Sequence, residues 1–336
     1  MTEPRTLLDD YDALLLDLDG TVYRGGEAVP GAAEAVASAR EQGVAVRFVT
    51  NNASRAPQQV AEHLSQLGFG AAVREVSTSA QAAAAVLATR VPAGSSVLVL
   101  GTEALADEVR SVGLVPVRTA EGAVAVVQGL SQDLGWRHLA EACVAIRAGA
   151  QWVACNVDAT LPTERGQLPG NGALVAALRT ATGVEPVVAG KPARPLMDQA
   201  VASTDATRPL VVGDRLDTDI AGARAAGLDS LLVLTGVSTP VELLAAQEEL
   251  RPTHVSADLS CVLRPAAESA VGPRPQWTVL VEDGVLSAAA AGAGDSLDLL
   301  RALCAAWWAA GGGTPELRAE DGAAKAALID LGLANS

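Results

Sequence analysis

Apolar and polar residues along the chain form short continuous apolar runs that alternate with longer amphipathic stretches. An apolar run over residues 13–18 is followed by an amphipathic stretch over 30–42, and the same succession repeats at 44–49 and 57–67. This alternation is typical of parallel strands joined by crossover helices. It predicts further strands at 97–100, 124–128, 152–155, 187–189, 209–212 and 230–234, and further helices at 103–112, 136–148, 172–182, 194–202 and 220–226. We therefore predict an α/β fold built on a parallel sheet.

The pattern changes near residue 251, where prolines become frequent. A hairpin is predicted over 277–286, because Asp283-Gly284 is a typical tight-turn pair between two apolar runs. Helices are predicted at 296–310 and 315–331. These features indicate a linker followed by a small C-terminal α+β unit, in which we expect Trp307 and Trp308 to belong to the core.

Composition and charge narrow the classes of function. The length of 336 residues suggests about two domains. The net charge of −15 repels phosphate backbones and anionic lipids, so we expect neither a nucleic-acid partner nor a membrane partner. Without a long apolar run or a signal-peptide pattern, we expect a cytoplasmic location. The spacing of the four cysteines fits neither a disulfide framework nor a zinc site, so free thiols are expected.

Chemically active side chains follow four of the predicted strands. Asp17 and Asp19 end the first strand, and side-chain alternation places them on the same face. The other members of the group follow later strands: Thr50, Asn51, Asn52, Lys191, Asp214, Asp217 and Asp219. Parallel strands present such residues at the carboxyl edge of a sheet, where α/β proteins bind ligands. Neighbouring carboxylates are costly without a cation, and Lys191 is one of only two lysines among 24 basic residues.

These motifs, in this order and strand context, resemble the haloacid dehalogenase superfamily of aspartyl-phosphate phosphatases over about residues 10 to 240. The resemblance implies a Rossmann-like core that binds Mg²⁺ and hydrolyses phosphate monoesters. It implies that Asp17 is the nucleophile and a metal ligand. Asp19 would be the general acid and base, with its backbone carbonyl on the metal. A dehalogenase has no use for this second acid, which favours the phosphatase reaction.

The resemblance also implies roles for the later motifs. Thr50 and the backbone N–H of Asn51 would hold a phosphoryl oxygen, while Lys191 would place a positive charge on the phosphate and the nucleophile. Asp214 would complete the metal ligands, an all-oxygen set suited to Mg²⁺. Asp219 would orient a metal-bound water or Lys191. A direct role for the neighbouring Asp217 stays open.

The spacing of the motifs indicates where an additional domain is inserted. About ten residues separate the first motif from the next helix, whereas about 140 separate Thr50 from Lys191. An insertion at this point resembles the type-2 cap of class IIA phosphatases, the NagD-like and p-nitrophenylphosphatase group. We predict a catalytic core over 1–77 and 188–255, a cap over 78–187 and a C-terminal extension over 256–336. The extension weakly resembles a GCN5-related acetyltransferase but lacks its acyl-CoA pyrophosphate loop, so no acetyl transfer is expected.

A cap above the site favours a small phosphorylated metabolite as the partner. The stretch 154–158 resembles the family loop that faces the substrate, so Asn156 and Asp158 are predicted to bind it together with Asn51 and Asn52. Ser131 stands where relatives carry an acid. Asn171 is interpreted as the cap of the helix that follows it.

The core, extension and composition together resemble actinobacterial phosphatases that act on glycerol 3-phosphate, which is the substrate we expect. Phosphoglycolate, pyridoxal phosphate and nucleotides are the alternatives within the family. A non-catalytic binding or regulatory module is the alternative of another class. Formation of a homo-oligomer through the cap or the C-terminal unit also stays open.

Overall fold

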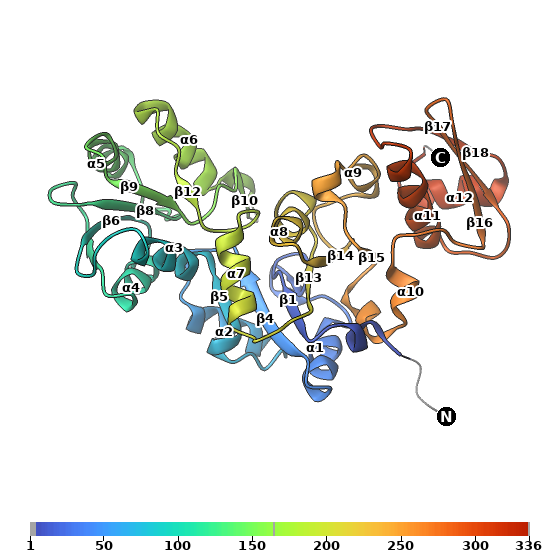
Figure 1. The fold of residues 1–336 in the computed structure, drawn as a ribbon, viewed down its shortest axis with the longest axis horizontal. Helices are drawn as coiled ribbons and strands as arrows, with labels where there is room; N and C mark the ends of the chain where they lie inside the picture. The colour runs from blue at the N-terminus through green and yellow to red at the C-terminus, as the bar shows by residue number, and fades with distance from the viewer. Residues whose placement is uncertain (1–4, 164, 335–336) are drawn as a thin grey trace. The chain divides into compact units, whose positions relative to one another are not determined.

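The computed structural model describes residues 5–163 and 165–334. The chain folds into two compact units, each with parallel strands and intervening helices, which confirms the predicted α/β class (Figure 1). The first unit comprises Met1–Val46, Leu67–Phe69 and Thr204–Ser336, and the second comprises Arg47–Gln66 and Gly70–Ser203. Strand β4 (Ala45–Thr50) begins in the first unit and ends in the second.

The first unit contains strands in the order β15-β14-β13-β1, and these three pairings are all parallel. Every residue of β1 and β13 is buried, as expected for a parallel sheet packed on both faces. The strands of this region, with a short hairpin, are β1 (Ala13–Leu16), β2 (Tyr23–Arg24), β3 (Glu27–Ala28), β13 (Pro209–Gly213), β14 (Asp229–Val233) and β15 (His254–Ser256). The helical elements are η1 (Leu7–Asp10), α1 (Ala32–Glu41), the π-helical turn η3 (Leu216–Ile220), α8 (Ala221–Ala226), α9 (Pro240–Leu244), η4 (Glu248–Leu250), η5 (Leu259–Leu263) and α10 (Ala266–Ser269).

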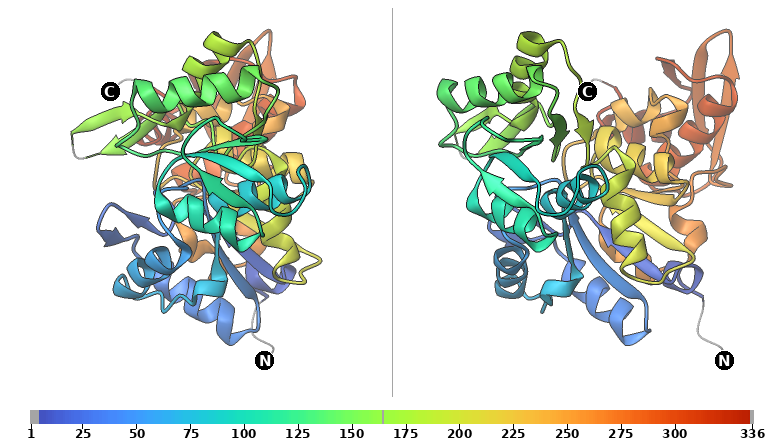
Figure 2. Two further views of the ribbon diagram at one scale, coloured as in Figure 1. Left: turned by 90° about the vertical axis from the view of Figure 1, so that its left-hand side faces the viewer. Right: turned by 60° about the vertical axis from the view of Figure 1, so that its left-hand side comes forward.

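The second unit contains a parallel sheet in the order β12-β9-β8-β6-β7. Helices α5 and α6 lie on one face of this sheet and α3 and α4 on the other, and a hairpin of β10 and β11 projects from it (Figure 2). Its strands are β5 (Val76–Thr78), β6 (Ser96–Leu100), β7 (Val115–Val117), β8 (Ala125–Gln128), β9 (Gln151–Ala154), β10 (Thr160–Thr163), β11 (Gly166–Pro169) and β12 (Val187–Val188). Its helical elements are α2 (Pro57–Gln66), η2 (Val73–Glu75), α3 (Ser79–Ala88), α4 (Glu103–Ser111), α5 (Trp136–Arg147), α6 (Asn171–Thr182) and α7 (Arg194–Ala202).

The chain ends in a small three-stranded sheet with two helices, residues 274–334, which we call the C-terminal part. The predicted hairpin is present, and the elements are β16 (Trp277–Glu282), β17 (Val285–Ala290), α11 (Ser296–Ala309), β18 (Glu316–Ala319) and α12 (Gly322–Asp330). The single helix predicted over 315–331 is wrong, because residues 316–319 pair with β17 as a parallel strand. The Asp321 side chain accepts the Ala324 N–H at 2.8 Å and thereby sets the start of α12.

The C-terminal part shares one hydrophobic core with the sheet of the first unit. Leu299, Leu303 and Trp307 of α11 pack in the same cluster as Leu243 of α9 and Val255 of β15. This confirms that Trp307 is a core residue, and Trp308 packs against the same cluster while partly buried. The C-terminal part is therefore continuous with the rest of the first unit.

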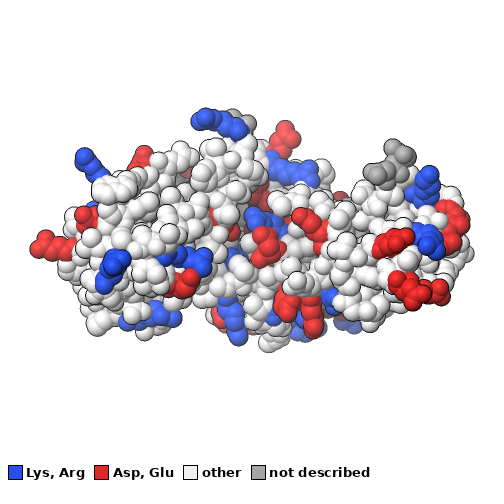
Figure 3. Space-filling model, turned by 90° about the horizontal axis from the view of Figure 1, so that it is seen from above, with Lys and Arg blue, Asp and Glu red and all other residues white. Residues whose placement is uncertain are grey.

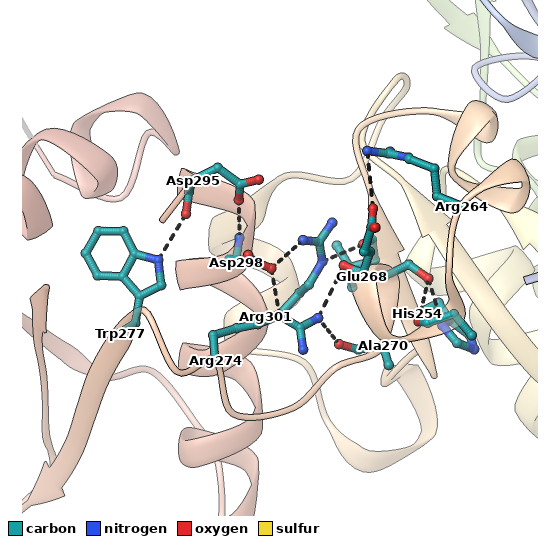
Figure 4. A network of polar contacts seen from close by, with 12 residues as sticks. His254, Arg264, Glu268, Ala270, Arg274, Trp277, Asp295, Asp298 and Arg301 are labelled. Carbon is teal, nitrogen blue, oxygen red and sulfur yellow. Dashed lines mark hydrogen bonds and ion pairs between the residues drawn. The ribbon is translucent and has the colours of Figure 1, made fainter. Parts of the chain in front are cut away.

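A polar network accompanies this apolar contact. Arg274 and Arg301 both point toward Asp298, to which they donate at 2.6 Å and 2.9 Å (Figure 4). Arg301 is only 5% exposed and also donates to the backbone carbonyl of Val255 at 2.9 Å. A buried guanidinium is thus shared between a carboxylate of α11 and the backbone of β15.

The cysteines, the helices and the surface charges complete the description of the fold. All four cysteines are free, and burial raises the pKa of the Cys261 thiol to about 11, which keeps it protonated at neutral pH. No helix among residues 5–163 and 165–334 is long and apolar enough to cross a membrane. Basic and acidic side chains are interspersed on the face seen in Figure 3.

Candidate active site

Three of the predicted acids come together in the first unit. Asp17 directly follows β1 and Asp214 directly follows β13, and these strands pair in parallel, so both residues lie at the same sheet edge. Asp219 reaches them from the π-helical turn η3. One carboxylate oxygen from each of the three lies within 4.8 Å of the others. Asp214 and Asp219 are buried and Asp17 is half-buried.

Close backbone packing holds two of these carboxylates in place. A Cβ atom on Gly236 would lie 1.9 Å from Asp214 Oδ2, and one on Gly213 would lie 2.3 Å from Asp219 Cγ. The Val237 N–H donates to Asp214 Oδ2 at 2.7 Å, and the Arg215 N–H donates to Asp219 Oδ2 at 3.2 Å. Glycine at these two positions leaves room for the carboxylates, and the main-chain hydrogen bonds hold them in the orientation seen here.

The carboxylates of the remaining acids of the motifs, Asp19 and Asp217, are not part of this group of three. Asp19 is exposed, and its backbone bridges to Tyr23 in the turn after β1. Asp217 faces outward and accepts from the Arg215 side chain at 2.8 Å and 3.0 Å. That hydrogen bond lowers the pKa of Asp217 and keeps it ionised. The structure thus engages Asp217 in an ion pair rather than in the acidic cluster.

The predicted phosphate-binding residues belong to the second unit. Thr50 ends β4 and is buried, and its Oγ1 accepts the Asn52 N–H at 3.1 Å. Lys191 follows β12 and is only 2% exposed, with its Nζ donating to the Val49 carbonyl at 3.1 Å. Gly190 permits this approach, because a Cβ there would lie 2.5 Å from the Cys155 carbonyl oxygen.

Four predicted residues of the second unit are linked by hydrogen bonds. The Asn51 side chain bonds to the backbone of Lys191, at 2.8 Å and 2.9 Å, and to the carboxylate of Asp158, at 3.2 Å and 3.3 Å. Asn156 donates from Nδ2 to the Asn51 carbonyl at 2.7 Å. Asn52 is exposed instead, and its Oδ1 accepts from Ser54.

Two contributors to this network were not predicted. Asn171 donates from Nδ2 to the Asn156 carbonyl at 2.7 Å, and Ser79 donates to the Asn51 carbonyl at 2.6 Å. The interpretation of Asn171 as a helix cap is wrong, because Gly170 occupies the N-cap of α6 and Asn171 is its first residue. Gly172, which follows Asn171, packs against the Val157 carbonyl. The glycine indicates a tight turn in the sequence, but nothing in the sequence indicates the hydrogen bond from Asn171 to Asn156. Ser131 forms a local turn, accepting the Asp133 N–H at 3.3 Å.

The fold and the acidic cluster define a hydrolase of the haloacid dehalogenase type, and comparisons with known proteins agree. The family model for haloacid dehalogenase-like hydrolases matches residues 14–115, and a second HAD-hydrolase-like model matches 188–262. The chain belongs to the haloacid dehalogenase-like hydrolase family, as the sequence predicts. A model of a GCN5-related N-acetyltransferase-like domain matches residues 274–333, which confirms the resemblance of the extension.

Its relatives include several named phosphatases. The chain is 51% identical over 314 residues to the D-glycerol 3-phosphate phosphatase of Mycobacterium tuberculosis, covering 91% of this chain and 88% of that protein. A crystal structure of a glycerol phosphate phosphatase from the same organism, in complex with magnesium, superposes with a TM-score of 0.94 at 50% identity, covering 98% of this chain and 99% of that one. The 5'-nucleotidase YutF of Bacillus subtilis is 40% identical over 252 residues, which are 74% of this chain and 96% of that relative.

Proposed function

We propose that this chain is a Mg²⁺-dependent phosphatase that hydrolyses a small phosphate monoester, with glycerol 3-phosphate as its substrate. The observation that carries the proposal is the cluster of Asp17, Asp214 and Asp219, whose carboxylate oxygens lie within 4.8 Å of one another. The names of both relatives support the reaction, and the name of the 51% identical relative supports the substrate. A glycerol phosphate phosphatase that holds magnesium supports the metal.

The residues of the cluster fit a hard divalent cation. Two of the three carboxylates are buried, and neighbouring buried anions are unfavourable unless a cation neutralises them. Oxygen-only ligand sets suit Mg²⁺, which retains several waters. Asp17, Asp214 and the backbone carbonyl of Asp19 would hold the ion, and Asp219 is near enough to orient a bound water. When bound, Mg²⁺ neutralises the negative charge that would keep a phosphate ester away from Asp17.

The reaction that we propose proceeds in two steps. A carboxylate oxygen of Asp17 attacks phosphorus, the bond from phosphorus to the alcohol oxygen breaks, and Asp19 gives that oxygen a proton. Water then attacks the aspartyl phosphate and gives its proton to Asp19, which releases phosphate and restores Asp17. Thr50, the backbone N–H of Asn51 and the Lys191 ammonium bind the phosphoryl oxygens.

The parts of the chain divide this work. We assign residues 1–77 and 188–255 to the catalytic core, 78–187 to a cap and 256–336 to an extension without acetyltransferase activity. Asn156 and Asp158 of the cap, with Asn51 and Asn52, are assigned to the substrate. A cytoplasmic location is part of the same proposal, because it would give the enzyme access to phosphorylated metabolites.

A nucleotide is the second candidate substrate, favoured by the 40% identity to a 5'-nucleotidase. Comparing kcat/KM for glycerol 3-phosphate, nucleoside monophosphates, phosphoglycolate and pyridoxal phosphate distinguishes the candidates. The glycerol 3-phosphate proposal requires the highest value for that ester. Absence of Mg²⁺-dependent turnover of p-nitrophenyl phosphate would instead indicate a non-catalytic module.

Asp17→Asn tests the nucleophile. An amide nearly matches the carboxylate in shape but cannot form the acyl phosphate, so we expect turnover to fall below detection while the protein stays folded. The measurement is kcat on p-nitrophenyl phosphate with Mg²⁺, together with the melting temperature. Retention of more than about a tenth of the wild-type kcat, a barrier change below about 1.4 kcal/mol, would contradict the assignment.

A further inference from the structure

The side chain of Asn51 is committed to a residue far away in sequence. The Lys191 N–H donates to Asn51 Oδ1 at 2.8 Å, and Asn51 Nδ2 donates to the Lys191 carbonyl at 2.9 Å. These two bonds engage the peptide groups on both sides of the Lys191 Cα. They therefore fix the backbone from which the lysine side chain extends.

The other end of Lys191 is held by the same strand end. Its Nζ donates to the carbonyl of Val49, two residues before Asn51, at 3.1 Å. Lysine has a flexible four-carbon stem, and ordering it costs conformational entropy that a fixed backbone reduces. Asn51 thus holds the backbone of Lys191, and Val49 holds its ammonium group. These two residues flank Thr50 in the chain.

Asn51 is itself held by buried polar groups from two other segments, one of which is held in turn by a third. Its carbonyl accepts from Ser79 at the start of α3, at 2.6 Å, and from Asn156 after β9, at 2.7 Å. Asn171 at the start of α6 donates in turn to the Asn156 carbonyl. Ser79, Asn156 and Asn171 are each less than a tenth exposed. Asn51 therefore has little freedom to move independently of these segments.

The same carboxamide also contacts the loop that follows β9. Asn51 Nδ2 lies 3.2 Å and 3.3 Å from the two carboxylate oxygens of Asp158. The Asp158 N–H donates to Asn156 Oδ1 at 3.3 Å, so this loop is bonded to Asn51 at two residues. One side chain therefore bridges the backbone of Lys191 and the carboxylate of Asp158.

We propose that Asn51 is a positioning residue: its side chain sets the place of the Lys191 ammonium and couples that place to Asp158. This inference rests on the proposed function, in which Lys191 binds the phosphoryl group. It is distinct from the role predicted for the Asn51 backbone N–H, which needs no side chain. A residue that only stabilised the fold would act independently of Lys191.

A double-mutant cycle separates these two roles. The wild type, Asn51→Ala, Lys191→Ala and the double variant are compared for kcat and KM on p-nitrophenyl phosphate and for the affinity of inorganic phosphate. We expect Asn51→Ala alone to lower kcat and phosphate affinity about tenfold each. In the Lys191→Ala background it should change both by less than about twofold, because the group that it positions is gone.

Several results would overturn the inference. An equal loss in both backgrounds means that Asn51 acts independently of Lys191, and a loss within twofold in the wild-type background means that it does not position the lysine. Asn51→Asp covers the case in which the alanine variant does not fold, because it retains size and the acceptor for the Lys191 N–H while losing the donor. It should show the same dependence on Lys191.

Controls distinguish the inference from the proposed function. Mg²⁺ affinity, measured by calorimetry without phosphate, should be the same in all four proteins of the cycle. Gln58→Glu, the same amide-to-acid change at an exposed position of α2, should leave kcat unchanged. If the wild type neither hydrolyses p-nitrophenyl phosphate nor binds phosphate, the proposed function fails and the inference falls with it. If only the cycle is additive, the inference fails alone.

Discussion

At the scale of single residues, the acidic cluster depends on glycines that pack against its carboxylates. Gly236 and Gly20 both lie against the Asp214 carboxylate, with would-be Cβ atoms at 1.9 Å and 2.5 Å from Oδ2, and Gly213 lies against Asp219. Each glycine lets the backbone approach a carboxylate that is then fixed by a main-chain N–H or a neighbouring turn. The geometry of the acidic cluster is thus set partly by residues that contribute no side chain to it.

Gly236→Ala should weaken Mg²⁺ binding. The added methyl group would overlap the Asp214 carboxylate and force it out of the cluster. We expect the Mg²⁺ concentration for half-maximal activity to rise about ten- to 100-fold, the usual effect of disturbing a residue that supports a metal ligand. Gly272→Ala, where a Cβ would meet open space, is the matched control. An unchanged Mg²⁺ requirement in Gly236→Ala would argue against Asp214 as a ligand.

Lys191→Arg should impair catalysis although the chain otherwise favours arginine. The site encloses a compact ammonium whose Nζ lies 3.1 Å from the Val49 carbonyl, and a planar guanidinium is too wide for the same place. We expect kcat/KM to fall at least about tenfold on every phosphate ester. Lys325→Arg at an exposed position of α12 provides the control, since it changes the only other lysine. Near-normal kcat/KM in Lys191→Arg would remove Lys191 from the site.

At the scale of elements, the ends of long strands could be predicted from the sequence, whereas short turns and short strands could not. Strand-end acids such as Asp17 and Asp214 were predictable, because alternation and apolar runs locate strand ends. Asp219 was also predicted near these acids, but the π-helical turn that carries it was not, because such a turn has no sequence period of its own. Strand β18 was missed for a similar reason, since only four residues separate Pro315 from Glu320. The contacts of Ser79 and Asn171 arise from tertiary packing alone.

Helix α11 contains a polar group on which the stability of its docking depends. Asp298 accepts from both Arg274 and Arg301, and Arg301 is only 5% exposed. Asp298→Ala should therefore leave a buried guanidinium with fewer partners and lower the free energy of unfolding by about 2 to 4 kcal/mol. Chemical denaturation measures this value. Asp330→Ala on α12, at an exposed position, should change it by less than about 0.5 kcal/mol. Equal effects of the two variants would show that the network contributes nothing specific.

At the scale of the whole molecule, the C-terminal part distinguishes this chain from its shorter relatives. The match to the 5'-nucleotidase covers 96% of that protein but only 74% of this chain. In this chain the sheet of the first unit does not pack alone, because Leu232, Leu243 and Val255 share a hydrophobic core with α11. Burial of apolar surface is the main stabilising contribution to folding, so this shared core makes the two regions interdependent.

Deletion of residues 274–336 should therefore destabilise the remainder. The deletion would expose the apolar side chains that now pack against Leu299, Leu303 and Trp307. We expect a lower melting temperature and association at micromolar concentration, measured by calorimetry and light scattering. A monomeric truncated protein that melts as the full chain does would show that this core is dispensable.

The contact between Arg301 and Val255 also affects the free edge of the sheet at β15. Strand β15 is the last strand in the order of its sheet, and a terminal strand ordinarily presents unpaired carbonyls that recruit strands from other molecules. Here the Val255 carbonyl accepts from Arg301, and the preceding Thr253 carbonyl accepts from the Val271 N–H at 3.0 Å. The sheet is thereby closed to further growth at this side. One of these two carbonyls is covered by Arg301, which lies in the segment that matches an acetyltransferase-like domain, so this segment contributes to covering the edge of the hydrolase sheet.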